Sequence, residues 1–158
     1  MANLEIVVDG DGHIFEDGLA IRKHMHGPAG ESHTAKMLGV FPALDHLHHG
    51  LNKIPPDSFG VGSDGVFRDP GATGWVDFMD KAGIETAVLY PTGGLAYGRI
   101  VDVDYAIAVC SAYNDWLTDA YSQVDGRFKG MALIPMQEPQ AAVEELRRAV
   151  TDLGMSGA

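Results

Sequence analysis

The chain has 158 residues, a length that fits one compact domain with its own core. Apolar residues make up 46% of the sequence and charged residues 21%, as in ordinary globular proteins. The formal net charge of −11 excludes nucleic acid and anionic membrane surfaces as binding partners, because both are negatively charged. No apolar stretch approaches the roughly 18 residues of a membrane span. The only cysteine, Cys110, rules out an internal disulfide, so we expect a cytoplasmic protein.

The first predicted element is a strand over about residues 5–13, which ends in acidic residues alternating with glycines and then a histidine. Side chains two apart on a strand share a face, so Asp9, Asp11 and His13 are expected on one face at its carboxyl end. Carboxylate oxygen beside imidazole nitrogen suits a divalent ion such as Zn²⁺ or Mn²⁺. A catalytic metal needs at least three protein ligands. The sequence therefore predicts part of a metal site, with further ligands supplied from elsewhere.

A long irregular stretch over about residues 14–71 holds six of the seven histidines. A short helix is expected over about residues 19–25. Its end carries His24 and His26, which should point apart because residues two apart on a helix diverge. Later in the same stretch, His48 and His49 are candidates to touch a substrate, with a solvated loop as the alternative.

The rest of the chain alternates between helix and strand. An apolar stripe over 102–123 predicts core packing, and we expect Asn114 and Asp115 on that helix to hydrogen-bond a neighbouring loop. The alternation predicts an α/β fold with a parallel sheet of right-handed βαβ units. The predicted elements are a helix from Thr73 to Gly83, a strand over 85–90, the helix over 102–123, a strand over 128–136, a helix from Pro139 to Gly154 and the start of a fourth strand over 155–158.

Five motifs in order resemble the amidohydrolase superfamily, in particular its second amidohydrolase-related branch. That branch contains aminocarboxymuconate-semialdehyde-decarboxylase-like and resorcylate-decarboxylase-like enzymes. The run from Val8 to Glu16 looks like the branch's Asp-x-Asp-x-His-x-x-Glu opening. The other runs that resemble the branch are residues 79–85, 113–117, 127–136 and 142–158.

The resemblance implies a TIM-type (β/α)₈ barrel, of which residues 1–158 are the N-terminal part of one domain, with a long insertion at about 14–71. Such a barrel takes about 250 residues, so this chain has room for three βα units and the edge of a fourth strand. The metal would lie at the carboxyl end of the strands. By position, Asp11 and His13 would be metal ligands, Asp9 and Glu16 would support them, and Thr92 would lie near substrate. The remaining ligands and the catalytic acid would follow Ala158.

The resemblance favours one divalent ion, Zn²⁺ or Mn²⁺, and non-oxidative decarboxylation of an aromatic or muconate-like carboxylic acid. Hydrolysis by a metal-activated water is the alternative within the family. A third possibility is an inactive fragment or half-barrel that needs a partner chain. The expected partners are a small-molecule carboxylic acid and either further copies of this chain or a complementing C-terminal half.

Overall fold

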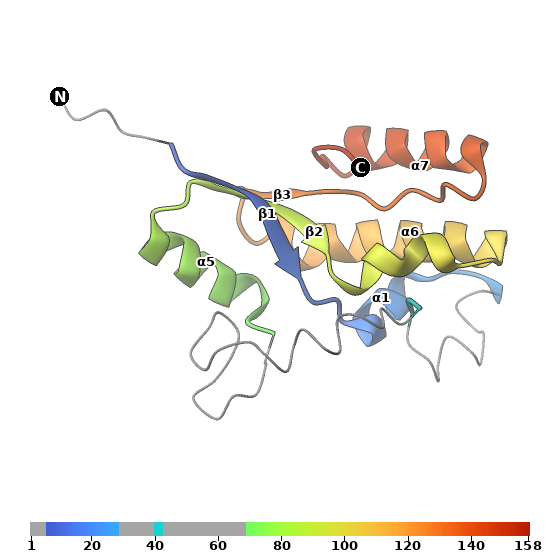
Figure 1. Ribbon diagram of the computed structural model, residues 1–158, viewed down its shortest axis with the longest axis horizontal. Coiled ribbons are helices and arrows are strands. Elements are labelled where there is room, and N and C mark those ends of the chain that lie inside the picture. The colour runs from blue at the N-terminus through green and yellow to red at the C-terminus, as the bar shows by residue number, and fades with distance from the viewer. Residues whose placement is uncertain (1–5, 29–39, 43–68) are drawn as a thin grey trace.

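The computed structural model describes residues 6–28, 40–42 and 69–158. Its centre is a three-stranded parallel sheet in the order β1-β2-β3 (Figure 1). The strands are β1 Val8–Ile14, β2 Thr86–Pro91 and β3 Phe128–Gly130. Successive parallel strands need crossover connections, which here carry the helices. The predicted succession of βα units is confirmed.

Apart from the 3₁₀ helix η1, which was not predicted, the helices begin and end close to the residues that the sequence predicts. Asp102 caps its helix by accepting a hydrogen bond from the Tyr105 backbone N–H at 3.0 Å, and Gly83 ends another in the left-handed region at φ 70°. No helix within the described parts of the chain is long and apolar enough to cross a membrane. The helices are α1 Gly18–His24, α5 Gly71–Ala82, the 3₁₀ helix η1 Gly93–Arg99, α6 Val103–Leu117, the π-helical η2 Thr118–Ser122 and α7 Pro139–Thr151.

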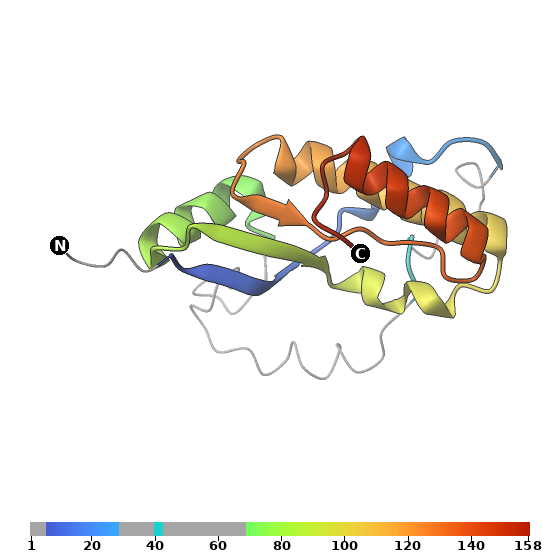
Figure 2. The same cartoon turned by 90° about the horizontal axis from the view of Figure 1, so that it is seen from above.

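The two faces of the sheet differ in burial. Along β2, Ala87 and Leu89 are fully buried, whereas the alternate residues on the other face are only half-buried. Helices α5 and α6 cover the buried face, because a Cβ added at Gly12 would meet Trp75 and one added at Gly130 would meet Leu117. Figure 2 shows α6 and α7 running alongside each other next to the sheet. The described residues therefore leave the second face largely uncovered.

The long apolar stripe of α6 is core, as predicted. Tyr113 and Leu117 are fully buried, and Trp116 is 5% exposed. Edge-to-face aromatic contacts extend this packing to β3. The ring centroids of Trp116 and Tyr121 are 6.0 Å apart, and those of Tyr121 and Phe128 are 5.7 Å apart. The predicted helix over 102–123 changes to π geometry after Leu117, with Gln123 N–H donating to the Thr118 carbonyl five residues back.

The prediction of a third strand over 128–136 is confirmed for residues 128–130 and is wrong for the residues that follow. Strand β3 ends at Gly130, and Met131 then makes a single parallel bridge to Gly157, which confirms the expected start of a fourth strand. At Leu133 the side chain of Asn114, instead of a neighbouring strand, hydrogen-bonds the backbone. Its Oδ1 accepts the Leu133 N–H at 2.9 Å, and its Nδ2 donates to the Leu133 carbonyl at 2.9 Å. Asn114 thus bonds a loop, as predicted, whereas Asp115 pairs with Arg148 of α7.

Candidate metal centre at the strand ends

Strand β1 contains a β-bulge next to the predicted ligands. Asp9 is in register with Ala87, but Gly12 is in register with Leu89, so β1 has one extra residue between them. In-register residues share a face. Asp9 therefore lies on the helix-covered face with Gly12, and His13 lies on the other face beside Tyr90. The prediction that Asp9 shares a face with His13 is wrong, because the bulge breaks the alternation.

The local sequence explains the bulge. The Asp9 carboxylate accepts the backbone N–H of Asp11 at 3.1 Å, a local bond that competes with regular strand pairing. Glycine is required at position 12, because a Cβ there would lie 2.9 Å from the Val88 carbonyl oxygen. The alternating acids and glycines thus shape the strand end as well as supplying donors.

His13 is held in the orientation that a metal ligand needs. Its Nδ1 lies 2.8 Å from the Pro91 carbonyl oxygen, and since that oxygen only accepts, Nδ1 carries the hydrogen. In the neutral ring the lone pair is then on Nε2, which lies 3.5 Å from Asp11 Oδ1. The side chains are 38% exposed for His13 and 87% exposed for Asp11. Both donors are open to a ligand, and a backbone carbonyl fixes the imidazole, as is usual for metal-binding histidines.

The donor set fits part of a divalent metal site. One carboxylate and one imidazole are the ligand types expected for Zn²⁺ or Mn²⁺. Among the described residues, no group of three or more His, Cys, Asp or Glu side chains is placed to hold a metal ion. A metal site built on Asp11 and His13 would therefore need additional ligands.

Glu16 connects the segment after β1 to the segment after β2. Its carboxylate accepts the backbone N–H groups of Gly93 at 2.9 Å and Gly94 at 2.7 Å. Burial raises the pKa of Glu16, and these hydrogen bonds oppose that rise by favouring the charged form. The glycine at 94 is required, since a Cβ would lie 2.6 Å from Pro91 Cβ. Glu16 thus fixes the chain just after the carbonyl that orients His13, and its support of the metal site remains a prediction.

Thr92 directly follows β2 and is 7% exposed. Its hydroxyl has no hydrogen-bond partner within the described residues. The other predicted substrate contacts, His48 and His49, lie outside the described residues. Sequence reasoning did not identify two groups beside His13: the Pro91 carbonyl, which orients its ring, and the Tyr90 side chain. The only available signal was that adjacent parallel strands bring their carboxyl ends together.

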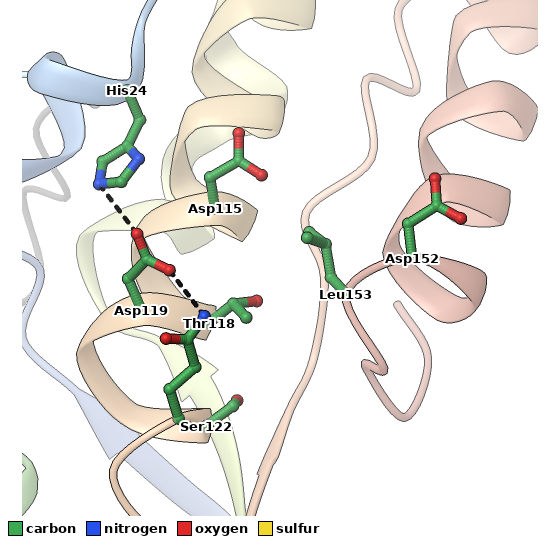
Figure 3. Close-up of a pocket in the computed structure, with 8 residues that line it drawn as sticks. His24, Asp115, Thr118, Asp119, Ser122, Asp152 and Leu153 are labelled. Carbon is green, nitrogen blue, oxygen red and sulfur yellow. Dashed lines mark hydrogen bonds and ion pairs between the residues drawn. The ribbon is translucent and has the colours of Figure 1, made fainter.

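A separate polar hollow of about 440 Å³ lies among helices (Figure 3), and neither Asp11 nor His13 lines it. Its carboxylates already have partners: Asp115 pairs with Arg148 at 2.6 Å, and Asp119 lies 4.0 Å from His24. His24 therefore points to α6 and η2 and not to the strand ends. The lining residues are His24, Asp115, Thr118, Asp119, Ser122, Gln123, Asp152 and Leu153.

Comparisons with known proteins identify the family of this chain. The model of the family described as Amidohydrolase matches residues 8–158. Gamma-resorcylate decarboxylase of Rhodococcus jostii is 41% identical over 80 residues, which are 51% of this chain and 24% of that protein. The matched segment, about half of this chain, thus covers about a quarter of the length of these curated relatives.

Solved structures give the same result for the fold. A dihydroxybenzoic acid decarboxylase from Polaromonas sp. JS666, with bound manganese and the inhibitor 2-nitroresorcinol, has a TM-score of 0.59 and 24% identity. A 2,6-dihydroxybenzoate decarboxylase complexed with 2,6-dihydroxybenzoate has a TM-score of 0.58 and 25% identity. Each likeness covers 98% of this chain and 38% of the solved one. The strand order, the βα succession and the match over residues 8–158 together show that this chain belongs to the amidohydrolase family.

Proposed function

We propose that this chain forms a metal-binding part of an amidohydrolase-family decarboxylase acting on a hydroxylated aromatic carboxylic acid. The observation that carries the proposal is the Asp11–His13 pair, with its imidazole fixed by Pro91 and its donors exposed at the strand ends. The relatives named above support the substrate class, since their names specify resorcylate and dihydroxybenzoate. Manganese in the Polaromonas structure supports a divalent ion.

In this proposal Asp11 and His13 bind the ion, and other residues hold them in place. Asp9 fixes the Asp11 backbone through its 3.1 Å hydrogen bond, and Glu16 anchors the segment that carries the Pro91 carbonyl. Thr92, whose buried hydroxyl has no hydrogen-bond partner within the described residues, would lie close to the substrate at the end of β2. When bound, the ion would hold substrate oxygens and stabilise negative charge that develops as carbon dioxide leaves.

Two ligands are fewer than the three that catalytic metal centres use. We place the others on strands outside the described residues, in a longer chain or in a partner that completes the barrel. The single bridge at Gly157 marks the sheet edge where the next strand would pair.

A hybrid barrel tests the proposal. Residues 1–158 replace the corresponding segment of the Rhodococcus gamma-resorcylate decarboxylase, and bound manganese and decarboxylation of 2,6-dihydroxybenzoate are measured. We expect Asp11→Asn and His13→Asn each to lower metal affinity and activity by more than about 100-fold, beyond the usual cost of changing a supporting residue. The control is Asp17→Asn, which keeps an N-cap side chain on α1. A folded hybrid whose metal content is unaffected by both ligand changes would contradict the proposal.

A further inference from the structure

Tyr90 lies next to the ligand pair on the less covered face of the sheet. It is in register with His13, and the two ring centroids are 6.1 Å apart with an interplanar angle of 35°. Its neighbour Pro91 supplies the carbonyl that fixes His13. Pro91 therefore sets the orientation of the His13 imidazole, and Tyr90 lies beside that imidazole.

The Tyr90 side chain combines an aromatic face with an unengaged hydroxyl. It is half-buried, whereas the adjacent Leu89 on the opposite face is fully buried. Within the described part of the chain, its hydroxyl makes no hydrogen bond, unlike Tyr105, whose hydroxyl donates to the Val40 carbonyl at 2.9 Å. Tyrosine hydroxyls ordinarily find a hydrogen-bond partner when they are buried, so a ligand that covers Tyr90 would have to supply one. Near two exposed metal donors, a bound ligand is the natural partner.

We infer that Tyr90 contacts the substrate and helps to select it, with its ring against the substrate's aromatic ring and its hydroxyl donating to a substrate oxygen. This inference rests on the proposed function, because the ion at Asp11 and His13 would place the substrate beside Tyr90. The aromatic contact favours ring-bearing acids over aliphatic ones. The hydroxyl adds a preference for an acid that presents a carboxylate or phenolic oxygen to it.

The test uses the hybrid barrel described above, which supplies the additional metal ligands, with Mn²⁺ and 2,6-dihydroxybenzoate as probes. Calorimetric titration measures Mn²⁺ binding, and the KM of Mn²⁺-dependent decarboxylation then reports how well the loaded hybrid binds the acid. Tyr90→Phe removes only the hydroxyl and should weaken binding of the acid about threefold to tenfold, with Mn²⁺ affinity unchanged. Tyr90→Leu removes the ring as well and should weaken it further. Tyr105→Phe, which loses a tyrosine hydroxyl elsewhere, should bind the acid as the wild type does.

The outcomes separate the two proposals. If the wild type binds the acid in a Mn²⁺-dependent way and both Tyr90 variants bind it equally well, the role of Tyr90 is refuted and the metal site stands. If the wild type shows no Mn²⁺-dependent binding of the acid, the proposed function fails and this inference fails with it. Loss of Mn²⁺ binding in Tyr90→Phe would assign Tyr90 to holding His13 and would also refute substrate contact.

Discussion

Replacing Asn114 by alanine should be among the most destabilising single changes in this chain. Asn114 is fully buried, and its amide bonds both backbone groups of Leu133, which is 6% exposed. The amide also donates to Glu145 Oε1 at 2.7 Å. Alanine would leave the Leu133 N–H and carbonyl buried without partners. Each such group costs about 1–3 kcal/mol, so we expect a loss of about 3–5 kcal/mol, from a total stability on the order of 5–15 kcal/mol.

Urea unfolding followed by circular dichroism measures this loss. Thr118→Val, one turn later on the same buried side, is the matched control. Its hydroxyl donates only to the Asn114 backbone carbonyl, so its removal should cost less than about 1.5 kcal/mol. Asn114→Asp gives a second measure: it keeps an acceptor for the Leu133 N–H but places a carboxylate beside Glu145, so it should also be strongly destabilised at neutral pH. A loss below about 1 kcal/mol for Asn114→Ala, at an unchanged denaturant slope, would refute the reasoning.

Three further predictions concern Gly94, Glu16 and Cys110. Gly94→Ala should lower the free energy of unfolding by about 1–3 kcal/mol, because its Cβ would lie 2.6 Å from Pro91 Cβ. Gly98→Ala in the same η1 helix meets nothing within 4 Å and should cost less. Urea unfolding of both variants measures the difference. Because burial raises the folded-state pKa of Glu16, its contribution to stability is fully present below the ordinary value of 4.5 and decreases as the pH rises through the folded pKa. The wild type should therefore lose stability relative to Glu16→Gln as the pH rises from about 4 to 7, and a constant difference in urea unfolding across that range would contradict this. Burial, with a smaller contribution from Glu145, raises the pKa of the Cys110 thiol to about 12. Ellman's reagent at pH 8 should therefore label the unfolded chain but not the folded chain. Rapid labelling of the folded chain would contradict this by showing that Cys110 is accessible.

Local sequence patterns predicted most of the architecture. Helical periodicity and the terminating residue Gly83 predicted the helices, because these signals act within one or two turns. Alternation of helix and apolar strand was enough to predict a parallel sheet. Spacing indicated Asp9, Asp11 and His13 as candidate metal ligands, and the family resemblance narrowed them to Asp11 and His13, whose role as ligands stays a prediction.

Tertiary contacts decided what periodicity cannot encode. Strand β3 is short because the side chain of Asn114, 19 positions earlier, hydrogen-bonds the backbone of Leu133. Which imidazole nitrogen of His13 faces outward depends on the Pro91 carbonyl, 78 positions away along the chain. The bulge in β1 moved Asp9 to the opposite face, which a simple count of alternate residues could not anticipate. The sequence by itself determined the elements and the donor atoms. Only the packing of one strand against the next determined how those atoms are presented, because that depends on register and on hydrogen bonds between distant residues.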